Sequence, residues 1–127
     1  MKLTRKSSTW LVAILTLVSF AVLPASSVLA SENKAGEMAG AVLFRDKGCA
    51  HCHGANLAGT KKGPSLVDIR KDKHWPPDKV KNQILNGGQK MPPFADSLTD
   101  QEIAQIIDYL RAKHRPVPPP ATTINQQ

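Results

Sequence analysis

The residues with the clearest chemistry are Cys49, Cys52 and His53, which form a C-x-x-C-H sequence. Residues three apart share one face of a helical turn, so both thiols can reach the same edge of a flat ring. Two thiols at this spacing can add to the two vinyl groups of one porphyrin, and the next histidine can ligate its iron. The sequence therefore predicts one haem c, attached through Cys49 and Cys52, with His53 as a metal ligand.

A bare C-x-x-C pair has three other uses, namely a disulfide, a thioredoxin-like redox pair and half of a zinc site. A zinc site needs two more ligands at short spacing, but the chain has only two cysteines and no H-x3–5-H pair. A thioredoxin-like pair belongs to a βαβ unit, and the sequence has no such pattern. The histidine directly after Cys52 favours haem attachment over these alternatives.

Residues 1–30 have the pattern of a secretory signal peptide, which predicts export by the Sec route to the periplasm. An uncleaved membrane anchor is the alternative, although the apolar stretch is shorter than the roughly 20 residues that a span requires. Cleavage would leave residues 31–127, the length of one small domain. The pattern consists of basic residues (Lys2, Arg5 and Lys6), an apolar stretch at residues 10–23, and small residues ending at Ala30.

The net charge of the chain indicates which kinds of molecule it can bind. The chain has 17 basic and 10 acidic residues, and loss of the three basic residues of the signal would leave a net charge of +4. A modest positive surface suits docking to an acidic patch on a redox protein, and it would equally serve solubility. We expect no nucleic-acid partner outside the cytoplasm. We expect a monomer that meets membranes only through a partner complex or an uncleaved signal.

Hydrophobic periodicity predicts an all-α domain with three main helices and no strands. The first helix is expected over residues 31–47, and a glycine inside it at Gly40 suggests close packing. The second is expected to begin at Pro76-Pro77 and to stop at Asn86. The expected apolar faces are Ala35, Met38, Ala39, Val42 and Leu43 on the first helix, and Val80, Ile84 and Leu85 on the second.

The last helix has the strongest local signals. Thr99 and Glu102 form the pattern of a capping box, and Leu98 and Ile103 stand where a hydrophobic staple would lie. Pro116 is expected to end the helix, so the domain is assigned to residues 31–115 and a flexible proline-rich tail to residues 116–127. The expected apolar stripe consists of Ile103, Ile106, Ile107 and Leu110, with Tyr109 at its edge.

A six-coordinate haem needs a second axial ligand opposite His53, and Met91 is the best candidate. It lies in a glycine-proline loop between two helices, where an isolated methionine has little core to join, and Pro92-Pro93 stiffen that loop. Met38 lies on an apolar helix face and is expected to be core. His74 is the main rival ligand. Its neighbour Trp75 is either core or a hydrogen-bond donor to a haem propionate.

Together these motifs resemble the class I cytochrome c family over about residues 40–110. The resemblance implies a cytochrome c-like fold around one covalent haem, with Gly40 and Phe44 packed against Tyr109-Leu110. It also implies that the Pro64 carbonyl of Gly63-Pro64-Ser65-Leu66 accepts a hydrogen bond from the second nitrogen of His53. The distal loop is matched by Asn86-Gly87 and by Met91-Pro92-Pro93-Phe94, whereas the tail after Pro116 has no counterpart.

With His53 and Met91 as metal ligands, the expected function is that of a periplasmic one-electron carrier and not of an enzyme. Two alternatives remain open, a tethered haem subunit of a larger oxidoreductase or oxidase, and a small haem enzyme or gas sensor with an open distal site. The expected cofactor-binding residues are Cys49, Cys52, His53, Pro64, Trp75 and Met91, and Lys61, Lys62 and Lys90 are expected to steer an acidic partner.

Overall fold

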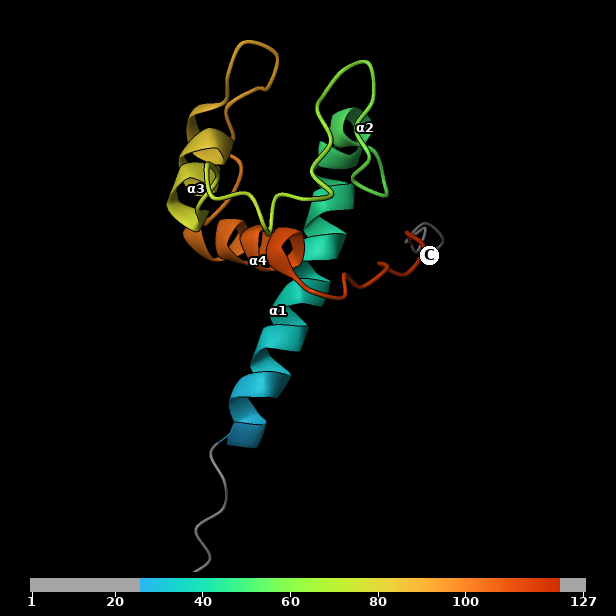
Figure 1. The fold of residues 1–127 in the computed structure, drawn as a ribbon, viewed down its shortest axis with the longest axis vertical. Coiled ribbons are helices and arrows are strands. Elements are labelled where there is room, and N and C mark those ends of the chain that lie inside the picture. Colours follow the sequence, from blue (N-terminus) through green and yellow to red (C-terminus); the bar gives the residue numbers. More distant parts are fainter. Residues whose placement is uncertain (1–25, 122–127) are drawn as a thin grey trace, which may run out of the picture.

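Two helices cross near the middle of the fold. The computed structural model describes residues 26–121, in which helix α1 (Ser26–Asp46) packs against helix α4 (Asp100–Arg111) (Figure 1). One arm rises from the crossing with helix α2 (Cys49–His53), and a second arm rises beside it with helix α3 (Pro77–Asn86). Residues 26–121 contain no strand, so the predicted all-α architecture with three main helices is confirmed.

The crossing depends on a missing side chain at Gly40. A Cβ atom placed on Gly40 would lie 1.9 Å from the backbone oxygen of Gln105 and 2.8 Å from the Cβ of Tyr109. The two helix backbones can therefore approach only because this residue is glycine. One turn further on, the Phe44 ring lies against the Tyr109 ring at a centroid distance of 5.6 Å. This pair buries both rings.

The predicted apolar face of α1 is wrong in part. Ala35 is exposed and Met38 retains 39% of its accessible surface, so Met38 is not a core residue. The buried face consists of Gly40, Ala41 and Phe44. The periodicity of large apolar residues does not identify this face, because two of its three members are small. The expected close packing at Gly40, and of Gly40 and Phe44 against Tyr109, is confirmed. On α4 the stripe is correct, except that Tyr109 is buried in the core and Ile107 is only half-buried.

Helix α1 begins at Ser26, five residues before the predicted start. It is therefore continuous across the expected cleavage position between Ala30 and Ser31. Most of the predicted signal peptide, residues 1–25, lies outside the described residues, and cleavage stays a prediction. No helix within residues 26–121 combines the length and the hydropathy that a membrane crossing requires.

Helix α3 follows its sequence prediction closely. Pro76 is its N-cap residue, Pro77 is the first helical residue, and Gly87 follows its last residue. Val80 and Ile84 are buried and Leu85 is half-buried, as predicted.

Helix α4 begins as predicted and ends early. Leu98 and Ile103, the predicted staple pair, are both buried. The helix ends at Arg111, four residues before the predicted end at residue 115, because Ala112 has an extended conformation (φ −56°, ψ 139°). Arg115 then folds back and donates to the Leu110 carbonyl. This bond satisfies a carbonyl oxygen that the shortened helix leaves free.

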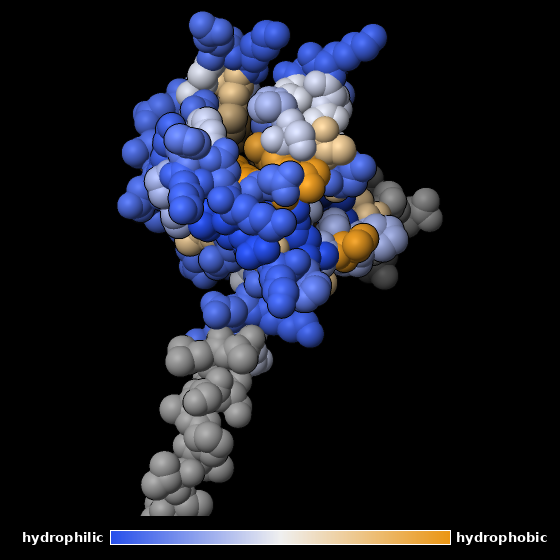
Figure 2. Space-filling model, in the orientation of Figure 1, coloured by the Kyte–Doolittle hydropathy of each residue, from blue (hydrophilic) through white to orange (hydrophobic). Residues whose placement is uncertain are grey.

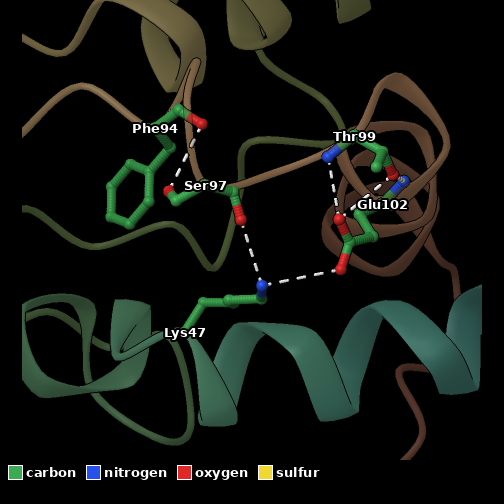
Figure 3. Close-up of polar contacts among 5 residues, drawn as sticks. All are labelled: Lys47, Phe94, Ser97, Thr99 and Glu102. Atoms are coloured by element: carbon green, nitrogen blue, oxygen red, sulfur yellow. Dashed lines mark hydrogen bonds and ion pairs between the residues drawn. The ribbon is translucent and has the colours of Figure 1, made fainter.

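The predicted capping box is present and is joined to α1. The Thr99 hydroxyl accepts from the Glu102 amide at 3.2 Å, and the Glu102 carboxylate accepts from the Thr99 amide at 2.8 Å. Lys47 lies 3.6 Å from the same carboxylate and donates to the Ser97 carbonyl at 3.0 Å (Figure 3). The end of α1 is thereby tied to the turn that leads into α4. These contacts, chiefly the bond from the Thr99 amide, hold the pKa of Glu102 below its ordinary value.

Acidification should remove the contribution of Glu102 to stability. Because the pKa of this carboxyl is lowered in the folded state, its contribution is complete above the unfolded pKa and is lost as pH falls through the folded pKa. Glu102→Gln keeps an acceptor at this position but cannot ionise. Thermal unfolding of both proteins can be measured from neutral pH down to about pH 3. We expect the variant to have the lower Tm at neutral pH, and we expect the difference in Tm between the two proteins to narrow on acidification. A difference in Tm that is independent of pH would contradict a stabilising role for the ionised Glu102.

Candidate functional site

The two arms enclose a cavity of about 630 Å³ above the crossing of α1 and α4. This volume lies within the roughly 300–1,000 Å³ of typical cofactor and ligand pockets. Figure 2 shows apolar side chains in the hollow between the arms and hydrophilic ones at the arm tips. The floor includes Phe44, Ile106 and Leu110 from the crossing helices. An apolar floor between two walls suits a flat, mostly hydrophobic group.

Five of the six predicted cofactor-binding residues line this one cavity. The sixth, Cys52, is half-buried on α2 and is not among the lining residues. The five lie up to 42 positions apart in the sequence, so the fold and not the local motif brings them together. The lining members of the predicted set are Cys49, His53, Pro64, Trp75 and Met91.

The short helix α2 carries the attachment motif. Gly48 precedes it with a left-handed backbone (φ 81°), which turns the chain sharply between α1 and α2. Cys49 and Cys52 are free thiols and do not form a disulfide. Cys49 packs against the hydrophobic core, and burial raises the pKa of its thiol. Both cysteines are half-buried three residues apart on one helix, the arrangement that two bonds to one ring edge require.

His53 is oriented by a backbone carbonyl. Its Nδ1 atom lies 2.9 Å from the Pro64 oxygen, and a carbonyl oxygen can only accept, so Nδ1 carries the proton. In the neutral imidazole this tautomer leaves Nε2 as the nitrogen that can bind a metal. The ring centroid lies 6.4 Å from that of Phe44 on the cavity floor.

The loop after α2 is held by hydrogen bonds that no sequence motif predicted. The Thr60 hydroxyl donates to the Cys52 carbonyl at 2.7 Å, and the Gly59 amide donates to the His53 carbonyl at 2.8 Å. Leu57 is 1% exposed and has a left-handed backbone (φ 63°), a conformation that costs about 1–2 kcal/mol for a residue with a side chain. These contacts fix the residues that lead to Pro64.

The distal loop folds back onto the end of α3. Gly87 has φ 69°, and a Cβ on it would lie 2.5 Å from the Met91 oxygen. The Gly88 amide donates to that same oxygen at 2.8 Å, and the Phe94 amide donates to the Ile84 carbonyl at 3.1 Å. The side chain of Gln83 closes the loop by donating to the Gly87 carbonyl. The result is a tight loop that presents a half-buried Met91 to the cavity.

The rival ligands lie elsewhere. His74 is exposed and is not among the lining residues, although its neighbour Trp75 is half-buried and lines the cavity. Met38 projects from α1, outside the cavity. His51 is exposed, with Nε2 2.6 Å from the amine of Lys62. Residues 26–121 also contain no group of three or more His, Cys, Asp and Glu side chains arranged to hold a metal ion.

The charged residues around the cavity are unevenly placed. Lys90 lines it from the arm that contains α3, and Asp68 and Asp72 line it from the segment between the arms. Lys61 and Lys62 are exposed on the loop after α2. The three lysines were predicted to lie near the cofactor, but the two aspartates were not, because isolated acidic residues in a polar stretch give no pattern.

The chain is similar in sequence to several known cytochromes. Residues 35–110 match the sequence model of the family described as cytochrome c oxidase, cbb3-type, subunit III. Cytochrome c6 of Rippkaea orientalis is 33% identical over 101 residues, which cover 78% of this chain and 86% of that protein. No solved structure gives a significant match.

Two longer relatives share a shorter region. The cytochrome c subunit of menaquinol:cytochrome c reductase from Bacillus subtilis is 34% identical over 68 residues, 54% of this chain. The cbb3-type cytochrome c oxidase subunit FixP of Sinorhizobium medicae is 34% identical over 84 residues, 57% of this chain. The chain spans only 25% and 28% of these two relatives, so what they share with it is one region of each.

Proposed function

The chain belongs to the c-type cytochrome family that residues 35–110 match, and on that basis we propose that it is a periplasmic one-electron carrier with His53 and Met91 as iron ligands. Membership in this family implies one covalently bound haem c and an all-helical, cytochrome c-like fold. Cys49 and Cys52 have the spacing for its two thioether bonds. When bound, the haem supplies a one-electron couple between Fe(II) and Fe(III).

The proposal assigns His53 as the proximal ligand. The hydrogen bond from Nδ1 to the Pro64 carbonyl supports this role, because it fixes the tautomer and leaves Nε2 as the metal-binding nitrogen. The same bond makes the imidazole a stronger donor to the metal. This contact is the single observation on which the proposal chiefly rests, because it leaves a metal-binding nitrogen on a ring that lines the cavity.

Met91 is proposed as the distal ligand. It comes from the opposite arm to His53, and Gly87 and Gly88 hold its loop in one tight conformation. A thioether favours the reduced metal and raises the potential relative to a second histidine. Two protein ligands leave no open coordination position, which disfavours substrate binding and favours electron transfer alone.

Visible spectroscopy of the purified protein tests this assignment. We expect a methionine-to-iron charge-transfer band in the oxidised protein and no carbon monoxide binding in the reduced protein. Carbon monoxide binding without that band would instead support the enzyme or gas-sensor alternative, in which the distal position is open.

A second candidate function is that of a haem subunit in a larger complex. The family description and two relatives named as oxidase and reductase subunits favour it. The carrier is preferred because the match to cytochrome c6 extends over 86% of that protein, against about a quarter of each subunit. Gel filtration of a native extract separates the two, because a carrier elutes as a small single protein and a subunit elutes with its complex.

The lysines at the arm tips should accelerate reaction with anions. Changing Lys61, Lys62 and Lys90 together to Gln should lower the rate of oxidation of the reduced protein by ferricyanide about tenfold at low ionic strength, because steering by these charges is lost. The effect should shrink as salt is added. A matched control replaces Lys34, Lys73 and Lys113, which are exposed elsewhere. Equal rates of oxidation by ferricyanide in the two triple variants would show that the lysines at the arm tips do not steer the anion to the protein.

A further inference from the structure

One wall of the cavity contains no fully buried residue. Residues 66–75, here called the wall segment, cross between the two arms and contribute Leu66, Asp68, Ile69, Asp72 and Trp75 to the lining. No residue of this segment is fully buried. Leu66, Ile69 and Trp75 are half-buried and pack against the core, so the segment has only partial hydrophobic stabilisation. Other contacts must hold it in place.

Backbone hydrogen bonds do not anchor the wall segment along its length. The Leu66 amide donates to the Leu57 carbonyl at its start, and its remaining backbone bonds are local turns, such as Lys71 to Asp68 and Trp75 to Asp72. Within residues 26–121, no backbone hydrogen bond joins residues 67–75 to any of the helices.

Lys79 of α3 lies 4.6 Å from the ring centroid of Trp75. Two arginines near the end of α4 bind the backbone of the segment. Arg115 donates to the Val67 carbonyl at 2.8 Å and the Leu66 carbonyl at 3.4 Å, and also to the Leu110 carbonyl on α4 at 2.8 Å. It therefore joins two cavity-lining leucines through their backbones. Arg111 donates to the carbonyl of Trp75 at 3.2 Å, at the other end of the segment, and to that of Arg70 at 3.4 Å, in its middle.

We propose that Arg111 and Arg115 are positioning residues that hold the wall segment against the haem and thereby raise its midpoint potential. The inference rests on the proposed function, because it requires a haem in this cavity. Neither arginine lines the cavity. They act through the carbonyls that they bind, and these belong to residues whose side chains face the cofactor site at Leu66 and Trp75.

The expected direction follows from hydration. A loosened wall admits water to the cavity, and water stabilises the oxidised centre, which carries more net charge than the reduced one. The potential should therefore fall. Lysine keeps the positive charge but is a point donor without the rigid fork of a guanidinium, so it cannot bridge the same carbonyls in one geometry. An Arg→Lys change therefore removes the bridging hydrogen bonds while it keeps the positive charge.

The test uses holoprotein with Arg111→Lys, Arg115→Lys and the double variant. We expect the double variant to shift the reduction equilibrium about tenfold toward the oxidised form, which for one electron is 59 mV. Hydrogen exchange of the amides in residues 67–75 should be faster in the same variant. Arg45→Lys is the matched control, because Arg45 bonds Asp46 and the Pro119 carbonyl and does not touch the wall segment.

Both changes together support the proposal, and each single variant should show a smaller shift of the same sign. A fall in potential without faster exchange would overturn it, because charge or long-range effects would then be the cause. Faster exchange at an unchanged potential would also overturn it. Absence of the methionine-to-iron band in the unmodified protein would count against the proposed ligation and leave the exchange comparison valid.

Discussion

Met91→Ala should abolish the methionine-to-iron charge-transfer band and open the distal position to carbon monoxide. The midpoint potential should fall by a substantial part of the ~0.8 V range over which axial ligands tune haem proteins, because the thioether that favours the reduced state is lost. Visible spectra in both redox states and a potentiometric titration measure these effects. The fold should persist, since Met91 is only half-buried in a loop.

Met38→Ala is the matched control for this variant. Met38 lies on α1, is 39% exposed, and does not line the cavity. Its replacement should leave the spectrum and the potential unchanged. If Met91→Ala kept the band and bound no carbon monoxide, another residue would have to be the sixth ligand, and the distal assignment would be wrong.

Gly40→Ala should destabilise the protein by about 3 kcal/mol, the upper end of the usual range for overpacking. The new methyl group would lie 1.9 Å from the backbone oxygen of Gln105, and a backbone atom cannot move aside as a flexible side chain can. The crossing of α1 and α4 must then widen. Thermal unfolding should show a fall in Tm of about 10 °C or more for a domain of this size.

Gly36→Ala tests the same helix without the clash. Its Cβ would meet only the side-chain oxygen of Asp108, at 3.2 Å, and alanine is favoured over glycine by up to about 1 kcal/mol inside a helix. This variant should be neutral or slightly stabilised. Equal destabilisation by both substitutions would show that the crossing at Gly40 is not the reason for the glycine.

Features with a local cause were predictable from the sequence. The spacing of Cys49, Cys52 and His53 predicts its own helical turn, and that turn is present as α2. The start of α4 follows from Thr99 and Glu102, because both partners of the capping box lie within four residues. Each of these depends on contacts between near neighbours, which a sequence displays directly.

Features that depend on tertiary contact were missed by the hydrophobic pattern, although the family resemblance implied the contact of Phe44 with Tyr109 and that of His53 with Pro64. The buried face of α1 is set by where α4 crosses it, so small residues at Gly40 and Ala41 are buried while Met38 is exposed. The early end of α4 depends on the return of Arg115 to the Leu110 carbonyl.

The residues expected to bind the cofactor were predicted from the sequence, but the contacts that support them were not. Its residues came from motifs and from a family resemblance, and the structure brings five of the six to one cavity. The supports around them were not predicted, because a buried Leu57 with positive φ and two arginines bound to distant carbonyls have no signature in sequence. Residues 1–25 and 122–127, parts of the predicted signal and tail, lie outside the described residues.

The most direct test of the account is the mass of the purified polypeptide, measured under denaturing conditions after expression with intact haem-attachment machinery. We predict residues 31–127 plus one tetrapyrrole per chain, with the added mass on the peptide that contains Cys49 and Cys52. A chain that carries no added tetrapyrrole, with both thiols free, would contradict the account.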